Sequence, residues 1–424
     1  MDFAESTKYL YSLGNEVLAM KLGLENVRTL LTALGEPQNN YLKVQVAGTN
    51  GKGSVCAFLN SICLEAGVKT GLYTSPHLVS ITERVKINGV NVGEDEFAQL
   101  ATAVRETSEK LVADGDLESA PTFFEQVTAI ALNSFAGAKV ELAILETGLG
   151  GRLDATTAAN AEVAAITRID IDHQEYLGET LEEIAGEKAA IIHQGSRVVV
   201  VGEQDSEAME VITSFSTNLG VSPRLVEKCV RTTCGSGWLK FTTEHAEYEL
   251  ESLGLPGWHQ IENAKIAILA AEMLQDHFPI SAGNIVEGLT NARHPGRLEL
   301  SGKYLFDGAH NVGGAKALRA FLEEFVTQPI TMIFGAMKDK QVAEIAEILF
   351  PKADNLILTQ PDNSRAMTAA EIAGYAGDAK NTIITVDVAD ALERANVVSN
   401  DETLILVTGS LYLIGEVKRL ISSC

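Results

Sequence analysis

A glycine-rich segment near the start of the chain combines the residue types that bind phosphate groups. It reads Ala47-Gly-Thr-Asn-Gly-Lys-Gly-Ser54 and lies between an expected strand and an expected helix. Glycines let backbone N–H groups approach a phosphate, Lys52 adds a positive charge, and the helix N-terminus adds its dipole. The Ser54 hydroxyl can reach a metal ion on a nucleotide. Val46 replaces the first glycine of the full phosphate-loop pattern, so an ordinary turn with a solvated lysine is the alternative.

Polar residues also follow three other expected strands. The segments are Thr74-Ser-Pro-His77, Glu146-Thr-Gly-Leu-Gly-Gly-Arg-Leu-Asp154 and Asp170-Ile-Asp-His173. Because the carboxyl ends of parallel strands share one edge of a sheet, we expect a hydroxyl, a carboxylate and an imidazole to gather beside the phosphate loop. Such ligands suit Mg²⁺ held jointly by protein and phosphates. Taken singly, each residue is more often a helix cap or a solvated side chain, and Asp172 has the alternative role of orienting His173.

The elements that must position these residues are short apolar runs alternating with amphipathic stretches, a pattern typical of parallel sheets with crossover helices. In the first part of the chain we expect strands at 41–47, 68–73, 140–145, 163–167 and 197–201. The helices expected there span 55–66, 123–135, 180–192 and 260–274, the third opened by a capping box at Thr180–Glu183. Alternating polar and apolar residues between glycine-rich turns predict a small antiparallel meander at about 221–256.

A domain boundary is expected at His294-Pro-Gly-Arg297. Beyond it, strands that alternate with helices are expected at 304–306, 330–334, 355–358, 382–386 and 404–407. The sequence therefore predicts an α/β fold of two domains. A phosphate-loop-type, mostly parallel sheet domain with a small antiparallel β insert is expected at 1–296, and a smaller Rossmann-like domain at 297–424.

Composition and charge narrow the class of protein. The 424 residues are 46% hydrophobic, which excludes a disordered chain, and five cysteines without a C-x-x-C pair argue against a disulfide framework or a thiolate zinc site. A net charge of −24 repels nucleic acid and anionic lipid, so neither is an expected partner, and an anionic substrate needs a local positive site or a metal. No apolar run reaches the roughly 18 residues of a membrane helix, and the acidic start does not resemble a signal peptide, so we expect a cytoplasmic protein.

The glycine-rich segment and the polar segments together resemble the folylpolyglutamate synthase family. Its bifunctional bacterial members are dihydrofolate synthase/folylpolyglutamate synthases, and the family is related to the Mur ligases. The resemblance covers almost the whole chain in the expected order, and its motifs are Gly48–Ser54, Ser75–Leu78, Glu83–Arg84, Leu145–Ala155, Asp172–His173, Glu187–Ile191, Pro295–Leu298, Asp307–Asn311 and Gly409–Leu413. The phosphate loop alone would not separate this family from the Mur ligases.

The resemblance implies an ATP-dependent amide ligase and assigns roles by position. The residues that match ATP-binding positions are Thr49, Asn50, Gly51, Lys52, Gly53, Ser54, Asn263, Arg297 and Asp307. The residues that match magnesium ligands are Ser75, Glu146 and His173, and two magnesium ions are expected. Lys188 matches a lysine that the family carries as a carbamate, which turns an ammonium into an oxygen donor; a plain Glu–Lys pair on a helix face is the alternative. We expect Lys52, Lys188 and His310 to be catalytic, with His310 as a candidate base.

The resemblance also implies positions that bind a pterin substrate. They are Met20, Lys21, Leu22, Arg84, Thr122, Phe123, Phe124, Glu125, Leu153, Asp154 and Ala155. One of the two phenylalanines can stack on a flat ring, although at least one is expected to belong to the helix core. Asp154 can accept hydrogen bonds from the N–H groups of the ring, and Arg84 can bind a carboxylate through two hydrogen bonds.

The expected reaction adds L-glutamate to dihydropteroate, giving dihydrofolate, and to reduced folates, giving folylpolyglutamates. ATP first activates the substrate carboxylate as an acyl phosphate, which the amine of glutamate then attacks. The implied partners are small molecules, and we expect a monomer. Two alternatives remain: a Mur-type ligase acting on a cell-wall precursor, against which the pterin positions argue, and a non-catalytic nucleotide-binding module, against which the second domain argues.

Overall fold

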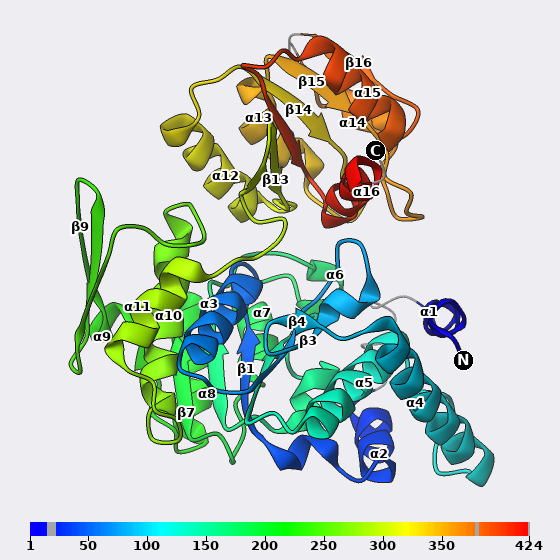
Figure 1. Ribbon diagram of the computed structural model, residues 1–424, viewed down its shortest axis with the longest axis vertical. Coiled ribbons are helices and arrows are strands. Elements are labelled where there is room, and N and C mark those ends of the chain that lie inside the picture. Colours follow the sequence, from blue (N-terminus) through cyan, green and yellow to red (C-terminus); the bar gives the residue numbers. More distant parts are fainter. Residues whose placement is uncertain (15–22, 378–380, 423–424) are drawn as a thin grey trace. The chain divides into compact units, whose positions relative to one another are not determined.

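The computed structural model describes residues 1–14, 23–377 and 381–422, and its contacts divide the chain into two compact units (Figure 1). The first unit contains Met1–Ser75, Ile81–Gly254 and Ile261–Ala292. The second contains Pro76–Ser80, Leu255–Gln260 and Arg293–Cys424. The long C-terminal part of the second unit begins near the expected boundary, and two short segments from earlier in the chain group with it.

An eight-stranded sheet forms the centre of the first unit, in the order β4-β3-β2-β5-β1-β6-β7-β8. Its strands are β1 (Leu42–Ala47), β2 (Thr70–Tyr73), β3 (Val85–Ile87), β4 (Val90–Asn91), β5 (Leu142–Glu146), β6 (Val163–Ile166), β7 (Val198–Val201) and β8 (Arg224–Leu225). The β3 and β4 strands run antiparallel at one end, and the other neighbours are parallel. The five strands predicted for this part of the chain are confirmed, and they lie side by side in the sheet.

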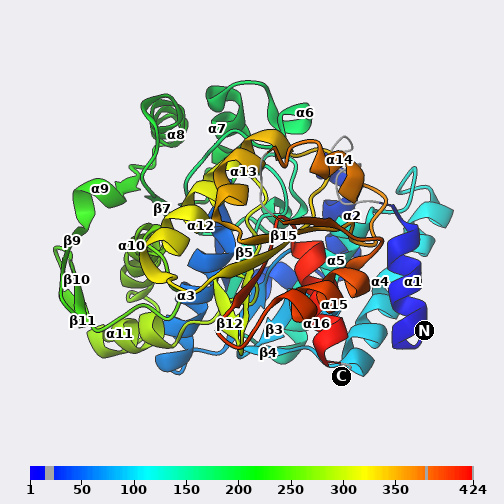
Figure 2. The same ribbon diagram turned by 90° about the horizontal axis from the view of Figure 1, so that it is seen from above.

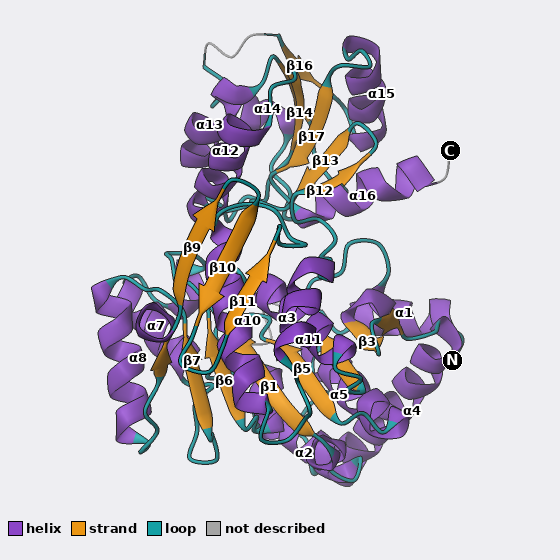
Figure 3. Ribbon diagram, turned by 60° about the vertical axis from the view of Figure 1, so that its left-hand side comes forward, coloured by secondary structure: helices purple, strands orange, loops and turns teal. Residues whose placement is uncertain are grey.

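Helices cover both faces of this sheet (Figure 3). The helices of this part of the chain are α1 (Phe3–Ser12), α2 (Glu25–Ala33), α3 (Lys52–Glu65), α4 (Glu94–Asp114), α5 (Phe123–Ala138), α6 (Gln174–Leu177), α7 (Leu181–Ala189), α8 (Ser206–Asn218), α9 (Val226–Cys229), α10 (His259–Leu274) and α11 (Ala282–Asn291), with 3₁₀ turns η2 (Pro37–Asn40), η3 (Ile81–Arg84) and η4 (Ala155–Ala159). Leu145 packs with α5 and Ala164 packs with α7 and α8, and the register places both side chains on the same face. The α3 helix packs on α11, where a β-carbon on Gly288 would lie 2.4 Å from the Cα of Ile62.

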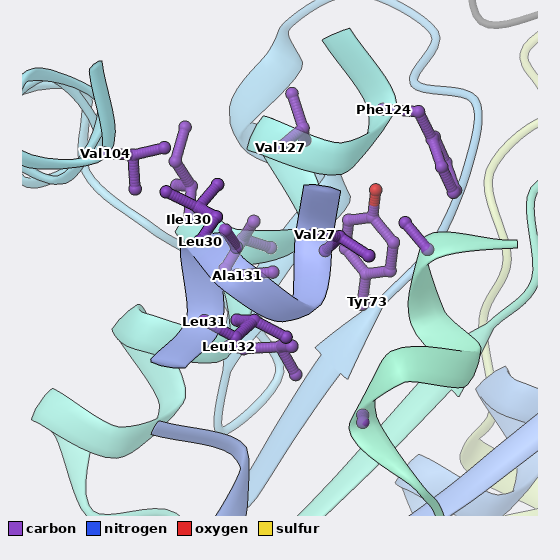
Figure 4. Close-up of a cluster of buried hydrophobic side chains, with 14 of the residues drawn as sticks. Val27, Leu30, Leu31, Tyr73, Val104, Phe124, Val127, Ile130, Ala131 and Leu132 are labelled. Atoms are coloured by element: carbon purple, nitrogen blue, oxygen red, sulfur yellow. The ribbon is translucent and has the colours of Figure 1, made fainter. Parts of the chain in front are cut away.

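A hydrophobic core joins α2, α4 and α5 to the sheet (Figure 4). Its labelled members are Val27, Leu30, Leu31, Tyr73, Val104, Phe124, Val127, Ile130, Ala131 and Leu132. Thr128 of α5 donates a hydrogen bond to the hydroxyl of Tyr73, which ends β2, at 3.3 Å. Burial of these apolar side chains fixes the position of α5, and with it the residues at the N-terminus of that helix.

The small antiparallel insert is present, but it spans fewer residues than expected. It consists of β9 (Arg231–Gly235), β10 (Trp238–Thr242) and β11 (Glu247–Leu250), and Figure 2 shows it alongside α11. The start of the range predicted for it instead forms β8, which pairs in parallel with β7 in the large sheet. Glu272 of α10 accepts hydrogen bonds from Tyr248 at 2.7 Å and from Thr243 at 2.5 Å, which attaches the insert to the helix layer.

The second unit has a six-stranded sheet in the order β12-β13-β17-β14-β15-β16. Its strands are β12 (Glu299–Ser301), β13 (Tyr304–Asp307), β14 (Ile330–Phe334), β15 (Asn355–Leu358), β16 (Thr382–Ile384) and β17 (Leu404–Thr408); only β12 is antiparallel. Its helices are α12 (Val312–Phe325), α13 (Val342–Leu349), α14 (Ala369–Ala373), α15 (Val388–Val398) and α16 (Leu411–Ser422), with η5 (Phe350–Lys352). Two apolar clusters flank the sheet, one with α12, α13 and α14 and the other with α15 and α16. Across the part of the chain that the structure describes, no helix combines the length and apolar character needed to span a membrane.

Candidate active site at the carboxyl edge of the large sheet

Four neighbouring strands of the large sheet, β2, β5, β1 and β6, end at one edge, and candidate residues follow each of them. The parallel register keeps these ends level, pairing Tyr73 with Leu145, Val46 with Glu146, and Ala47 with Ile166. Ser75 therefore follows β2, Glu146 ends β5, the phosphate loop follows β1, and the segment with His173 follows β6. The expected placement of these segments along one edge is confirmed, whereas the roles of the individual residues stay predictions.

The phosphate loop joins β1 to α3 along a backbone path that requires glycine. Gly48 and Gly51 have φ angles of +150° and +92°, which residues with side chains rarely adopt. A β-carbon on Gly51 would also lie 2.2 Å from Oδ1 of Asn263, so α10 brings this expected nucleotide-binding residue against the loop. The α3 helix begins at Lys52, and the N–H groups of its first turn point to this edge of the sheet.

Two lysine side chains converge on a single carbonyl group of the phosphate loop. Lys52 donates a hydrogen bond from Nζ to the carbonyl of Gly48 at 3.0 Å and another to that of Thr49 at 3.3 Å. Lys188 donates from Nζ to the same Gly48 carbonyl at 2.9 Å. In a chain with a net charge of −24, Lys52 supplies local positive charge of the kind that a polyphosphate needs.

The surroundings of Lys188 set its ionisation. The α7 helix that carries it opens with the predicted capping box, in which Thr180 and Glu183 bond to each other's backbone N–H groups. The lysine is 3% exposed, and burial together with the positive charge of Lys52 lowers its pKa to about 7. A substantial fraction of the Lys188 side chain is therefore a neutral, nucleophilic amine near pH 7.

Glu146 and Ser75 meet across the boundary between β5 and the segment after β2. Oε2 of Glu146 accepts a hydrogen bond from the backbone N–H of Ser75 at 3.1 Å, and the glutamate is 5% exposed. A buried carboxylate is costly unless hydrogen bonds or a cation stabilise its charge. The contact brings two of the three expected magnesium ligands together.

His173 lies in a strained backbone position after β6, with a φ of +53°. Its backbone N–H donates to Oδ1 of Asp172 at 2.9 Å, and its ring Nε2 lies 3.9 Å from Oδ2 of the same carboxylate. Asp172 therefore holds the backbone of His173 through a hydrogen bond. Its carboxylate also lies within ion-pair distance of the His173 ring. The left-handed conformation of a residue with a side chain costs free energy, which is typical of functional positions.

The donor set at this edge fits Mg²⁺ bound together with phosphate. Within residues 1–14, 23–377 and 381–422, the side chains of His, Cys, Asp and Glu form no group of three that could hold a metal by themselves. Mg²⁺ commonly takes one or two protein ligands and fills its remaining positions with phosphate oxygens and water. The buried carboxylate of Glu146 beside Ser75 suits that mode of binding.

The segment from Thr122 to Glu125 opens α5, and its polar side chains bond to each other. Thr122 and Glu125 form a capping box, in which Oε2 of Glu125 accepts from the backbone N–H and the hydroxyl of Thr122 at 2.8 Å. Phe123 and Phe124 are 3% and 8% exposed, so both rings belong to the core. Phe123 lies between two neighbours: Tyr11 stacks on it with ring centroids 5.6 Å apart, and the Arg84 guanidinium lies 5.3 Å from its centroid.

The loop after β5 is organised by Asp154. One carboxylate oxygen accepts from the backbone N–H groups of Gly148 and Leu149 at 2.8 and 3.0 Å. The other accepts from the backbone N–H of Thr156 at 3.0 Å and from its hydroxyl. Burial raises the pKa of Asp154, and these four donors oppose that shift. A pterin N–H group would therefore have to share or replace a protein donor, so loop formation is the role that the geometry itself supports.

The structure describes only some of the remaining predicted substrate positions. Leu153 and Ala155 flank Asp154, and Ala155 begins η4. Met20, Lys21 and Leu22 lie outside the described residues.

The expected nucleotide-binding residues of the second unit lie at the end of β13. Both carboxylate oxygens of Asp307 accept backbone hydrogen bonds, from Leu298 at 2.9 Å and from Ala309 at 3.0 Å. Arg297 donates to the carbonyl of Gly308 at 3.4 Å, and Nδ1 of His310 lies 2.7 Å from the same carbonyl. A proton on Nδ1 of His310 would leave Nε2 as the acceptor, as a general base requires.

Sequence reasoning gave no role to two residues that touch the predicted site. Asp170 bonds to Asn50 of the phosphate loop, and although its segment was singled out, nothing in the spacing pairs these two positions. Tyr11 stacks on Phe123 from α1, a helix whose sequence carries a capping box at Asp2 and Glu5 but no motif of the family resemblance.

The comparisons with known proteins agree with this architecture. The Mur ligase middle domain matches residues 46–271, and the Mur ligase glutamate ligase domain matches residues 296–411. The Bacillus subtilis dihydrofolate synthase/folylpolyglutamate synthase is 34% identical over 418 residues, covering 96% of each chain. A solved structure of Escherichia coli FolC with DHPP and ADP is 30% identical with a TM-score of 0.89, covering 100% of this chain and 98% of that one. A Mycobacterium tuberculosis folylpolyglutamate synthase structure with ADP and AMPPCP is 30% identical, also with a TM-score of 0.89, and covers 99% of each chain.

The matches to the two Mur ligase domains define the class of protein, the Mur-type ligases. Within that class, the chain belongs to the dihydrofolate synthase/folylpolyglutamate synthase family. The resemblance seen in the sequence motifs is thereby confirmed over the whole length of the chain.

Proposed function

We propose that the protein is an ATP-dependent ligase that joins L-glutamate to dihydropteroate and to reduced folates. The observation that carries this proposal is the convergence of Lys52 and Lys188 on the Gly48 carbonyl, at the sheet edge that also holds Glu146. The Lys52 ammonium at this edge gives an acidic chain local positive charge for a triphosphate. The names of relatives that match nearly the whole chain supply the substrates.

The reaction must make an amide bond in water, where a carboxylate is a poor acyl donor. An oxygen of the pterin-linked carboxylate attacks the γ-phosphorus of ATP, the bond to ADP breaks, and an acyl phosphate forms. The amine of glutamate, after losing a proton, attacks the acyl carbon, and inorganic phosphate leaves. His310 is our candidate for the group that accepts the proton.

The residues of this chain contribute chiefly charge and position. Lys52 offsets the negative charge that develops on the transferred phosphoryl group, and the first turn of α3 directs N–H groups toward it. Ser75, Glu146 and His173 would hold magnesium, which neutralises phosphate oxygens when it is bound. Asn263 meets the phosphate loop at Gly51, so it lies where the bound nucleotide would be.

Product analysis tests the proposed activity. Purified protein with MgATP and L-glutamate should convert dihydropteroate to dihydrofolate, and a reduced folate to species longer by one or more glutamates, as mass spectrometry of the products would show. Conversion of a cell-wall nucleotide precursor instead would favour a Mur-type ligase of another specificity. ATP binding without any product would favour a nucleotide-binding module.

We further propose that Lys188 is carbamylated in the active enzyme. Its lowered pKa, about 7, supplies the neutral amine that attacks carbon dioxide; an N–C bond forms and one proton is released. The carbamate replaces a buried cation with an oxygen donor beside the phosphate loop. Burial of Lys188 shields the product from solvent.

The carbamate predicts an activity that depends on dissolved carbon dioxide and on pH. Because Lys188 is protonated below about pH 7, bicarbonate should restore the activity of carbon-dioxide-depleted enzyme faster at pH 8 than at pH 6, at matched dissolved carbon dioxide. Lys188→Met should be nearly inactive and unresponsive to bicarbonate. Lys43→Met is the control, since Lys43 is also buried in this unit but pairs with Glu162. A parent enzyme that ignores bicarbonate at both pH values would refute the carbamate.

Gly51→Ala should weaken MgATP binding by at least about tenfold. The substitution combines a left-handed φ with a β-carbon 2.2 Å from Oδ1 of Asn263, so the loop or the Asn263 side chain must shift. Titration calorimetry measures the affinity, and thermal unfolding checks the fold. Gly137→Ala is the control, because apart from its chain neighbours and its own helix backbone no atom lies within 4 Å of the β-carbon it would add. Equal affinity of Gly51→Ala and the parent would show that the loop does not contact the nucleotide.

A further inference from the structure

The phosphate loop is attached to the segment after β6 by a dense set of hydrogen bonds. The backbone N–H groups of Thr49 and Asn50 donate to the Arg168 carbonyl at 2.9 and 3.2 Å. The Thr49 hydroxyl lies 3.0 Å from the carbonyl oxygen of Asp170 and 3.1 Å from its backbone nitrogen. The Asn50 amide donates from Nδ2 to Oδ2 of Asp170 at 2.8 Å. The first half of the loop thus rests on two residues, Arg168 and Asp170, that lie about 120 positions later in the chain.

A carboxylate at this place is unexpected on electrostatic grounds, because it stands beside a loop that is to receive phosphates. Arg168 offsets its charge: Nε lies 3.3 Å from Oδ1 of Asp170, and a terminal nitrogen lies 2.7 Å from Asp205 at the start of α8. The arginine is shared between the two carboxylates. The negative charge of Asp170 is therefore compensated, and its acceptor oxygen remains available to Asn50.

We infer that Asp170 is a positioning residue for ATP, which holds the Asn50 side chain and so sets the shape of the phosphate loop before the nucleotide binds. The inference rests on the proposed function only in requiring that the loop binds a nucleoside triphosphate. Asp170 touches no reacting atom and acts through Asn50. Preorganised loops bind more tightly because less conformational freedom is lost on binding.

The test is a double-mutant cycle on nucleotide affinity. Titration calorimetry with AMPPNP and magnesium measures binding without turnover, so an absence of ligase activity, which would contradict the proposed function, leaves this readout intact. Asp170→Ala and Asn50→Ala should each weaken binding by about tenfold, the size expected for losing a hydrogen bond to a charged acceptor. The double variant should bind no more weakly than either single variant, because each removes the same contact.

Two further variants separate positioning from general destabilisation. Asp170→Asn keeps an acceptor oxygen for Asn50 and should restore affinity to within about threefold of the parent. Asp205→Ala removes the other carboxylate from Arg168 and should bind AMPPNP as the parent does. The affinity for dihydropteroate should be unchanged in the Asp170 and Asn50 variants.

Additive losses in the double variant would overturn the inference. So would an Asp170→Asn variant as weak as Asp170→Ala, or an Asp205→Ala variant with the same loss. If Asp170→Ala does not fold, the Asn50→Ala and Asp170→Asn variants decide the question. Weak binding of AMPPNP by Asn50→Ala together with normal binding by Asp170→Asn supports the inference. Normal binding by Asn50→Ala overturns it.

Discussion

Replacing Lys52 with alanine is expected to lower turnover by more than about tenfold, through lost stabilisation of the phosphoryl-transfer transition state. The ammonium of Lys52 now donates to the carbonyls of Gly48 and Thr49, from which it can turn to a phosphate. Its removal should also raise the pKa of Lys188, because the charge of Lys52 is one of the causes that lower it. Steady-state rates of ADP formation under saturating substrates measure the loss.

The control for this variant is Lys110→Ala, which removes an exposed lysine from α4 without touching the sheet edge. Its turnover should equal that of the parent. If Lys52→Ala turned over at a near-normal rate, the phosphate loop would not be where ATP reacts, and the site assignment along this edge would fail.

Replacing Glu146 with glutamine is also expected to lower turnover by more than about tenfold at a fixed magnesium concentration. Glutamine keeps an oxygen that can accept the hydrogen bond from the Ser75 backbone but carries no charge to hold a cation. Higher magnesium should recover part of the lost rate. The measurement is turnover as a function of magnesium concentration.

The matched control is Glu141→Gln, which changes a glutamate immediately before the opposite end of the same strand, β5. Glu141 accepts a backbone hydrogen bond from Lys69 at 2.9 Å, so the two variants alter similar contacts at the two ends of β5. An unchanged magnesium dependence in Glu146→Gln would remove Glu146 from the metal site.

The central strands of both sheets could be predicted from the sequence because their physical signal is local. Apolar runs such as 142–145 and 330–334 are buried on both faces, as parallel strands are, and each is bounded by turn-forming or polar residues. The edge elements could not be predicted in this way. The β3 and β4 strands are three and two residues long. The α1 helix is held by a contact with the distant residue Gln126, and the Met1 amino group before it by one with Thr102.

The sheet edge that holds the candidate site could be predicted from the sequence, because the carboxyl ends of parallel strands lie together at one edge of a sheet. Finer contacts depend on tertiary packing: Asn50 and Asp170 are far apart in sequence, and no local pattern pairs them. Thr122 and Glu125 have the spacing of a capping box, which is a local signal for a helix start, although the resemblance implies only a substrate-binding role for them. Asp154 likewise proved to be surrounded by donors from its own loop.

The most direct measurement is phosphate release by the purified protein given MgATP, L-glutamate and dihydropteroate, compared with mixtures that each lack one component. We expect release from the complete mixture alone, with one phosphate for each dihydrofolate formed. Release that needs neither pterin nor glutamate, or that occurs only with a cell-wall nucleotide precursor, would contradict the proposal that this sheet edge activates a pterin-linked carboxylate.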